Sequence, residues 1–520
     1  MPIRIRPDDN QGNYNPRSRG RGGGGGGIGG GGLIQFLPLL LQLFGRNPKL
    51  LLLIAIIGGG YMLFSKGCGG SPSSSSSEMS LSTGANFDAA KYAATEIFEP
   101  LADNKSNPLP EGVSLLKYAP TRGNQGQQGS CVAWAAAYAA RTIMQARATG
   151  QDPNTIIFSP SFLYNQIALE DCQGSYLPEA LKVMENKGLA SLKDMPYSDQ
   201  DCSQRPNNFQ LQSATQFKIE GYQRLTGGAQ GQDASSVNML AIKQNIAQGA
   251  PVLIGMMVGG SFMQEMMGED MWTPSDGDYD MRGFGGHAMC VIGYDDYKFA
   301  RNMGGFQIMN SWGMEWGKNG VGWVSYDDFQ HFTKEAYGIY PMSDASAPQT
   351  NMLQAQIGVV LNDNGQRVAL QQKDAFNYTT VQNMTKGAGF KLEITNNIAC
   401  YAYIFGMETD GTSYTLFPYT PKHSPFFGIT GSRLFPRDHS FFADDVGTTD
   451  YFAIVISGEP LDYDAFSKRL SSAAGASYSD KLQSVIGQQN ATFSYTGNAI
   501  SVQSQLQAKS LLGCVVEVKK

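Results

Sequence analysis

One cysteine, one histidine and one asparagine follow each other along the chain, each inside a segment that suits catalysis. Cys131 follows the stretch NQGQQGS, His287 lies in GGHAMCVIGYDD, and Asn310 lies in IMNSWGMEWGKNGVGWV. A thiolate can attack a carbonyl carbon, an imidazole can take and return the proton, and an amide can orient the imidazole through its second nitrogen. A lone cysteine is more often a buried packing residue. The three residues together therefore predict nucleophilic catalysis at Cys131.

The residues around Cys131 suit the same chemistry. Gln125 offers a side-chain amide that, with the backbone N–H of Cys131, can face a developing oxyanion. The alanine-rich run over residues 131–150 predicts a helix that ends at Gly150, with Ser130 as its N-cap. Cys131 would then lie on the first turn, where the positive end of the helix dipole stabilises a thiolate.

These segments resemble those of the papain-like (C1 family) cysteine peptidases. NQGQQGSCVAWA resembles the nucleophile segment of the family, GGHAMCVIGY its histidine segment, and MNSWGMEWGKNGVGWV its asparagine segment. The resemblance implies an α+β fold over residues 106–345, with a helical lobe and a β-barrel-like lobe. It also implies a Cys-His-Asn site that cleaves peptide bonds in a peptide or protein substrate, with Gln125 at the oxyanion position.

Two positions depart from the family pattern. Val132 stands where the family usually has tryptophan, and Trp134 follows two residues later. Gln128 stands where the family often has a cysteine, so Cys172 lacks its usual disulfide partner. Cys172 then pairs with Cys202, or both are free thiols.

The family's inhibitory prosegment is a long helical domain, and the chain has little room for one. Only about 40 residues, many of them serine, separate the apolar N-terminal stretch from LPEGVSL (109–115). The amphipathic run FDAAKYAATEIFEPL predicts a short helix. We therefore expect no conventional prosegment, although residues 86–100 could occupy part of the active-site cleft.

The N-terminal residues predict a membrane anchor. Residues 1–48 read as a disordered Arg/Gly-rich arm, and residues 49–67 as a transmembrane segment without charge between its flanking lysines. A buried helix is the alternative. All arginines of the N-terminal region precede the apolar stretch. We therefore expect the arm to lie in the cytoplasm and the folded domains to lie outside the cytoplasm, in the periplasm or at the cell surface. Residues 68–105 read as a flexible linker, and lipidation of Cys68 stays open.

The C-terminal region predicts a second domain. Short strand-like runs separated by turn residues fill residues 351–520 and favour an all-β, sandwich-like domain. It resembles an uncharacterised bacterial β accessory domain found beside peptidase modules. We expect it to bind a partner in the cell envelope, or to be a structural appendage.

The composition excludes several classes of protein. A net charge of −6 argues against nucleic-acid binding. The seven cysteines form no CxxC pair and the four histidines are scattered, so we expect neither a metal nor a cofactor. Cys290 reads as a core residue. The sequence thus predicts a membrane-tethered bacterial cysteine peptidase. The alternatives are a non-catalytic envelope-binding scaffold and a Cys/His amidase, and the Asn-Ser-Trp-Gly motif disfavours the amidase.

Overall fold

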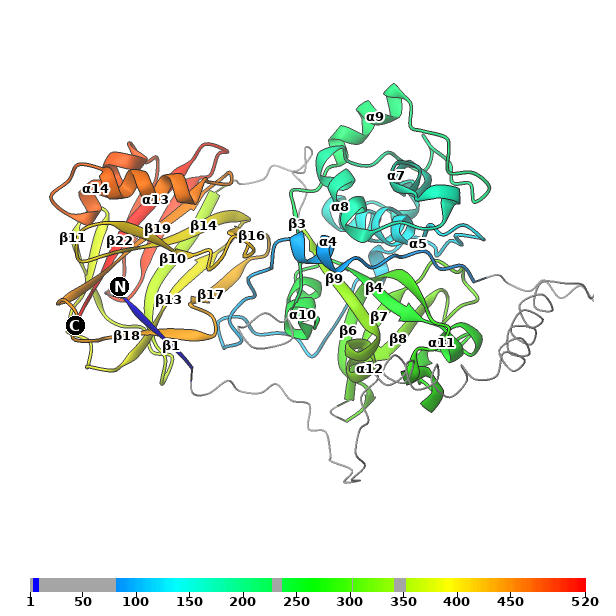
Figure 1. Ribbon diagram of the computed structural model, residues 1–520, viewed down its shortest axis with the longest axis horizontal. Helices are drawn as coiled ribbons and strands as arrows, with labels where there is room; N and C mark the ends of the chain where they lie inside the picture. Colours follow the sequence, from blue (N-terminus) through cyan, green and yellow to red (C-terminus); the bar gives the residue numbers. More distant parts are fainter. Residues whose placement is uncertain (1–2, 9–80, 227–235, 302, 341–351) are drawn as a thin grey trace, which may run out of the picture. The chain divides into compact units, whose positions relative to one another are not determined.

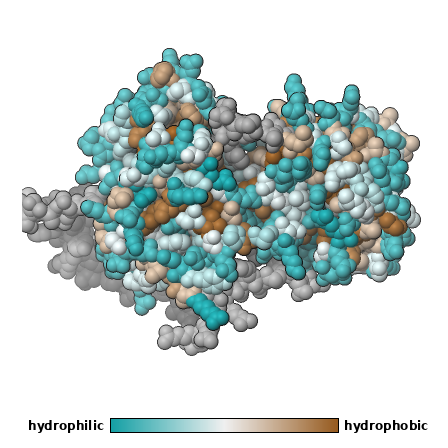
Figure 2. All heavy atoms as spheres, turned by 180° about the vertical axis from the view of Figure 1, so that it is seen from behind, coloured by the Kyte–Doolittle hydropathy of each residue, from teal (hydrophilic) through white to brown (hydrophobic). Residues whose placement is uncertain are grey.

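The computed structural model describes residues 3–8, 81–226, 236–301, 303–340 and 352–520. A central domain (residues 108–340) carries the predicted catalytic residues, and a C-terminal domain (residues 352–520) follows it (Figure 1). On the face shown in Figure 2, polar side chains predominate and the apolar areas are smaller than the polar ones. The predicted α+β content of the central domain is confirmed.

The first half of the central domain is helical. Its longest helical run begins at Cys131 and comprises α5 (Cys131–Ala133), the wider π-helical turn η2 (Trp134–Arg141) and α6 (Thr142–Thr149). Gly150 ends the run in the left-handed conformation, as predicted. Ser130 makes no side-chain cap, because its hydroxyl is hydrogen-bonded to Tyr197 Oη at 2.7 Å. The other helices here are α7 (Pro160–Ile167), α8 (Leu177–Asn186) and α9 (Asn208–Ala214).

The second half of the central domain is built on an eight-stranded sheet in the order β3-β9-β4-β6-β7-β8-β5, with β2 also paired to β6. Its strands are β2 (Gly112–Ser114), β3 (Tyr222–Arg224), β4 (Val252–Val258), β5 (Met271–Trp272), β6 (Gly285–Ala300), β7 (Met303–Met309), β8 (Val321–Ser325) and β9 (Thr333–Ile339). The helices α10 (Met239–Ala247), α11 (Gly260–Gln264) and α12 (Tyr326–Phe332) accompany it. Strand β6 is central, so the residues at its start lie deep in the domain.

The C-terminal domain is a sandwich of two sheets around an apolar core. One sheet has the order β1-β18-β13-β10-β21-β20 with β17 on β13, and the other has the order β11-β12-β22-β19-β14-β15 with β16 on β14. The first sheet contains β1 (Arg4–Pro7), β10 (Met352–Leu361), β13 (Gly389–Asn396), β17 (Gly431–Phe435), β18 (His439–Phe442), β20 (Thr492–Tyr495) and β21 (Ile500–Gln505). The second contains β11 (Leu370–Asp374), β12 (Asn377–Thr380), β14 (Cys400–Met407), β15 (Ser413–Phe417), β16 (Phe426–Phe427), β19 (Thr449–Ser457) and β22 (Leu511–Lys519).

The pattern of the sequence explains this packing. In β10 the side chains of Leu353, Ala355 and Ile357 alternate inward between exposed neighbours, as a strand covered on one face requires. Two helices, α13 (Tyr463–Ser472) and α14 (Tyr478–Ile486), bury a second apolar cluster against β14, β19 and β22.

Two predictions about the N-terminal part need correction. Residues 4–7, placed in the disordered arm, form β1. Residues 81–105, placed in the flexible linker, are packed and include α4 (Ala89–Ala94), because their apolar side chains find cover: Tyr92, Phe98 and Leu101 are buried. The rest of the arm, the stretch 49–67 and Cys68 lie outside the described residues. Within the described residues, no helix has the length and apolar character to span a bilayer.

Candidate active site

Cys131 lies at the start of its helix and is fully buried. The backbone N–H of Ala288, at the beginning of β6, donates to its sulfur at 3.4 Å. Strand β6 is held in register by β4, with Met256 opposite His287. The helix start and the strand start therefore meet, and residue 288 on the strand touches the thiol.

His287 has one nitrogen bonded and one nitrogen open. Its Nε2 lies 2.7 Å from Asn310 Oδ1, and its ring stacks on the indole of Trp312 with centroids 4.4 Å apart. An amide oxygen only accepts hydrogen bonds, so Nε2 carries the proton of the neutral ring. Nδ1 is buried and has no hydrogen-bond partner among the described residues. The ring therefore keeps a lone pair on Nδ1, as a proton acceptor must.

Gln125 is fixed by the residue that follows Asn310. The hydroxyl of Ser311 donates to Gln125 Oε1 at 2.6 Å, and the backbone N–H of Gln125 donates to the Ser311 carbonyl at 2.8 Å. Gln125 Nε2 donates to the carbonyl of Gln128 at 3.0 Å. An amide NH₂ has two hydrogens, so one is left for a further acceptor. The loop before Cys131 is thus tied to the loop that carries Asn310.

A segment from outside the central domain covers these residues. We call residues 82–88 the covering segment. Ser175 and the segment exchange two backbone hydrogen bonds, from Ser175 N–H to the Gly84 carbonyl and from Asn86 N–H to the Ser175 carbonyl, both at 2.9 Å. The N–H groups of Gly84 and Ala85 lie 3.1 and 3.0 Å from the carbonyl of Gly286, the residue before His287. The indole N–H of Trp312 donates to the Ser82 carbonyl at 2.8 Å.

The covering segment fits against glycines that leave no room for side chains. A Cβ on Gly84 would lie 2.2 Å from the carbonyl oxygen of Gly129. The Phe87 ring lies over Gly255 and Gly286, where an added Cβ would approach ring carbons to 2.5 and 2.9 Å respectively. Because Gly129 and Gly286 lie two residues and one residue from Cys131 and His287, the segment sits directly on the candidate site.

Burial sets the charge state of the site. It raises the pKa of the Cys131 thiol to about 12, although the neighbouring backbone N–H groups of Ala288, Val132 and Ala85 oppose this effect. Burial lowers the pKa of His287 to about 4, and the bond to Asn310 opposes it. With the covering segment in place, the thiol and the imidazole are therefore both neutral at pH 7.

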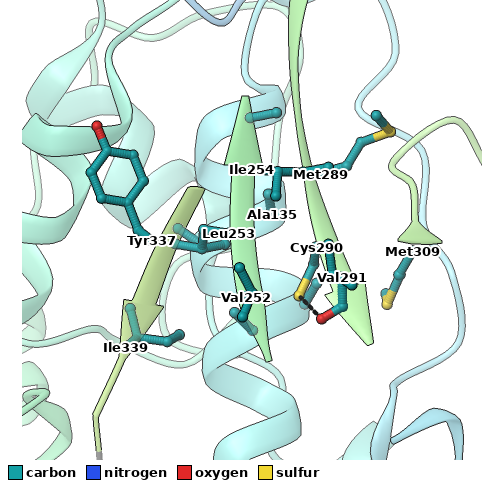
Figure 3. Close-up of a cluster of buried hydrophobic side chains, with 14 of the residues drawn as sticks. Ala135, Val252, Leu253, Ile254, Met289, Cys290, Val291, Met309, Tyr337 and Ile339 are labelled. Carbon is teal, nitrogen blue, oxygen red and sulfur yellow. Dashed lines mark hydrogen bonds between the residues drawn. The ribbon is translucent and has the colours of Figure 1, made fainter. Parts of the chain in front are cut away.

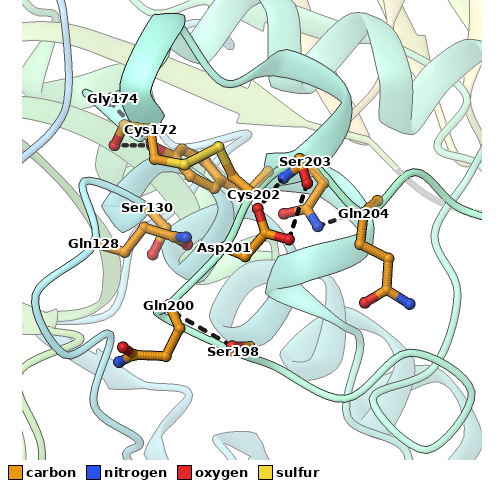
Figure 4. Close-up of a disulfide and its surroundings, with 12 residues drawn as sticks. Gln128, Ser130, Cys172, Gly174, Ser198, Gln200, Asp201, Cys202, Ser203 and Gln204 are labelled. Carbon is orange, nitrogen blue, oxygen red and sulfur yellow. Dashed lines mark hydrogen bonds between the residues drawn. A yellow bond between two sulfur atoms is a disulfide. The ribbon is translucent and has the colours of Figure 1, made fainter.

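The other cysteines have separate roles. Cys172 and Cys202 form a disulfide, which confirms the first of the two predicted alternatives (Figure 4). Gln128, which stands where the family often has a cysteine, lies near this bridge in Figure 4. Cys290 is fully buried among apolar side chains of β4, β6, β7 and β9, as predicted (Figure 3).

The structure buries all four predicted site residues and links their segments by hydrogen bonds: Gln125, Cys131, His287 and Asn310. Sequence reasoning missed most of the covering segment, because the predicted occupant of the cleft was 86–100 and the contacts come from 82–88. It also missed Ser311 and Tyr197. The hydroxyl of Tyr197 donates to the Gln125 carbonyl at 2.7 Å, which supports the loop before Cys131.

Known proteins resemble part of this chain. Residues 117–342 match the family described as "Papain family cysteine protease". The chain is 28% identical over 220 residues to an uncharacterised peptidase C1-like protein of Acanthamoeba polyphaga mimivirus, covering 41% of this chain and 64% of that protein. It is 27% identical over 242 residues to cathepsin L2 of Homo sapiens, covering 45% and 66%. The chain thus spans less than two thirds of the length of either relative.

Solved structures give a weaker likeness. The crystal structure of xylellain, a cysteine protease from Xylella fastidiosa, aligns with a TM-score of 0.40 at 23% identity, covering 52% of this chain and 100% of that one.

Proposed function

We propose, from the premise that residues 117–342 form a papain-family C1 peptidase domain, that this protein is a cysteine peptidase with a covered, latent active site. The observation that carries the proposal is the state of His287. Its Nε2 is held by Asn310 and its Nδ1 is open, beside a cysteine at a helix start.

These residues can perform peptide hydrolysis in two steps. Nδ1 of His287 takes the thiol proton of Cys131, and the thiolate attacks the substrate carbonyl. The second N–H of Gln125 and the backbone N–H of Cys131 stabilise the oxyanion. His287 then returns the proton to the leaving amine, and an acyl-enzyme remains on the sulfur. Water attacks this thioester with His287 as base, which releases the acid and restores the thiol.

Asn310 and Trp312 act as positioning residues in this scheme. The Asn310 amide oxygen stabilises the imidazolium through Nε2, and the stacked indole of Trp312 shields that bond from water. Ser311 is a positioning residue for Gln125, because its hydrogen bond to Oε1 fixes which atom of the Gln125 amide faces away from the site.

The covering segment has to leave before a substrate can bind. It occupies the backbone hydrogen-bonding groups of Ser175 and of Gly286, the residue before His287, and a substrate backbone would need the same space. We therefore propose that this covered form is latent. Displacement of residues 82–88 would expose Cys131 and let its pKa fall toward the value that helix starts favour.

We further propose an extracytoplasmic location, with membrane attachment through residues 49–67 and an envelope partner for the C-terminal domain. The Cys172–Cys202 disulfide supports the location, since structural disulfides persist in oxidising compartments. The attachment itself rests on the apolar character of the sequence.

The test compares peptide hydrolysis by two full-length variants, Gly84→Ala and Gly84→Ala/Cys131→Ala. The added Cβ displaces the covering segment without altering the site. We expect the first variant to cleave a fluorogenic peptide library and the second to be inactive. Equal turnover by both would refute the role of Cys131.

Complete burial of Cys131 and His287 favours one alternative, a non-catalytic scaffold that binds envelope components. In that case neither variant would cleave any peptide.

A further inference from the structure

The N-terminal peptide is an edge strand of the C-terminal domain. Strand β1 pairs antiparallel with β18, with Arg4 opposite Phe442 and Arg6 opposite Ser440 (Figure 1). The backbone N–H of Asp8 extends the pairing to the Asp438 carbonyl at 3.3 Å. The first sheet therefore ends in a strand that comes from more than 300 residues away in the sequence.

Two side chains, one at each end of the peptide, give this pairing specificity. Ile3 is only 3% exposed and belongs to the apolar core of the sandwich. At the other end the Asp8 carboxylate accepts hydrogen bonds from Lys391 Nζ at 2.6 Å, from Ser440 Oγ at 2.6 Å and from Asn362 Nδ2 at 3.2 Å. Backbone pairing alone would accept any extended peptide, whereas these two anchors select one.

Lys391 shows that the domain is built to receive a carboxylate here. Its side chain is buried, and its ammonium also donates to the carbonyls of Pro436 and Arg437 at 3.0 and 2.8 Å. A buried cation surrounded only by carbonyls is unfavourable unless a counter-ion pairs with it. Asp8 is that counter-ion.

Two arginines add weaker contacts along the edge. Arg4 Nε lies 3.2 Å from Asp444 Oδ2, and the guanidinium of Arg6 lies 3.8 Å from the centroid of the Phe442 ring. Arg4 is exposed, although Asp444 is buried, so the pair adds little free energy on its own, but it favours one register of the strand.

We propose that the edge of β18, with Lys391 beside it, is a peptide-acceptor site whose occupant is the N-terminal peptide of the same chain. The peptide and the C-terminal domain consequently share one compartment. The stretch 9–80 then has both of its ends in folded structure, at Asp8 and again from residue 81. This inference replaces the expectation that the N-terminal arm and the folded domains lie on opposite sides of a membrane, and it holds whether or not the protein is a peptidase.

The test is a cross-link in the full-length protein, expressed in cells. Arg6→Cys and Ser440→Cys are introduced together in a Cys68→Ser background, because directly opposed residues of antiparallel strands lie within disulfide range. A matched control places the second cysteine at Ser494, an exposed position on β20 at the opposite edge of the same sheet. A membrane-permeant oxidant is then added to intact cells.

We expect an intramolecular disulfide between positions 6 and 440, no disulfide between positions 6 and 494, and a rate at least about tenfold lower when Asp8→Asn removes the charged anchor. Equal cross-linking of position 6 to positions 440 and 494 would overturn the proposal of a specific acceptor site at β18. Cross-linked dimers in place of monomers would overturn the assignment to the same chain. A 6–440 disulfide that forms only after detergent solubilisation would overturn the shared compartment.

Discussion

The covering segment gives the sharpest prediction, because one methyl group should displace it. In Gly84→Ala the new Cβ would lie 2.2, 2.5 and 2.6 Å from the O, C and Cα atoms of Gly129. All three are backbone atoms, two residues before Cys131, so they cannot move aside as a flexible side chain would. Gly84 itself belongs to the covering segment and contributes nothing else to the site. The substitution should therefore open the site and leave its residues intact.

The magnitude follows from the contacts that the shift breaks. Three backbone carbonyl acceptors are at stake: that of Gly84 for Ser175, that of Ser175 for Asn86, and that of Gly286, which the N–H groups of Gly84 and Ala85 share. At about 1 kcal/mol each, their loss favours the open form by about 3 kcal/mol, or about 100-fold in its population. If Cys131 reacts only from the open form, its alkylation rate should rise by the same factor.

The assay is alkylation by iodoacetamide at pH 7, with each modified cysteine located by mass spectrometry. Gly277→Ala is the matched control, because a Cβ on Gly277 meets no atom within 4 Å. Cys290 reports on unfolding, since it is fully buried in the core of the same domain. A rate at Cys131 that stays at the wild-type value, with Cys290 protected, would refute the idea that residues 82–88 close the site.

Three further predictions concern the oxyanion, the disulfide and a buried carboxyl. Gln125→Ala in the Gly84→Ala background should lower kcat for peptide hydrolysis by about 100-fold, and an unchanged kcat would remove Gln125 from the oxyanion site. Cys172→Ser should lower the free energy of unfolding by about 3–4 kcal/mol in urea titrations, because it opens the loop of sequence separation 30, and an unchanged midpoint would contradict this. Burial raises the pKa of Glu335 from its ordinary 4.5 to about 7, against the hydrogen bonds from Tyr337 and from the backbone of Asp88. The folded state thus binds this proton more tightly than the unfolded chain, so wild-type stability should fall as the pH rises from 4.5 to 7, and Glu335→Gln should make that fall shallower.

The candidate catalytic residues could be predicted from the sequence because they lie in long, distinctive segments. The Asn310 segment combines Asn, Ser, Trp and Gly at fixed spacing, and the helix after Cys131 has the alanine content and terminal glycine that helices favour. The convergence of these segments is a tertiary property. It depends on β6 carrying His287 to the start of α5, which no local pattern encodes.

The covering segment was harder to predict because its contacts are made by backbone. Residues 82–85 read STGA, which signals only a loop, and apart from the Trp312 indole the groups named above that bind them are the N–H of Ser175 and the carbonyl of Gly286. Backbone groups are the same at every position, so side-chain reasoning does not find such contacts. Strand β1 was missed for the same reason. Its arginines suggested a disordered arm, whereas its main chain pairs with β18 at the edge of a sheet.

The central claim is that Cys131 is a nucleophile served by His287, and trapping tests it most directly. The full-length Gly84→Ala protein is treated with a peptidyl epoxide, and the adduct is located by mass spectrometry. The account predicts one adduct, on the sulfur of Cys131, which His287→Ala abolishes. No adduct on Cys131 in folded Gly84→Ala protein, or an adduct that forms equally well without His287, would contradict it.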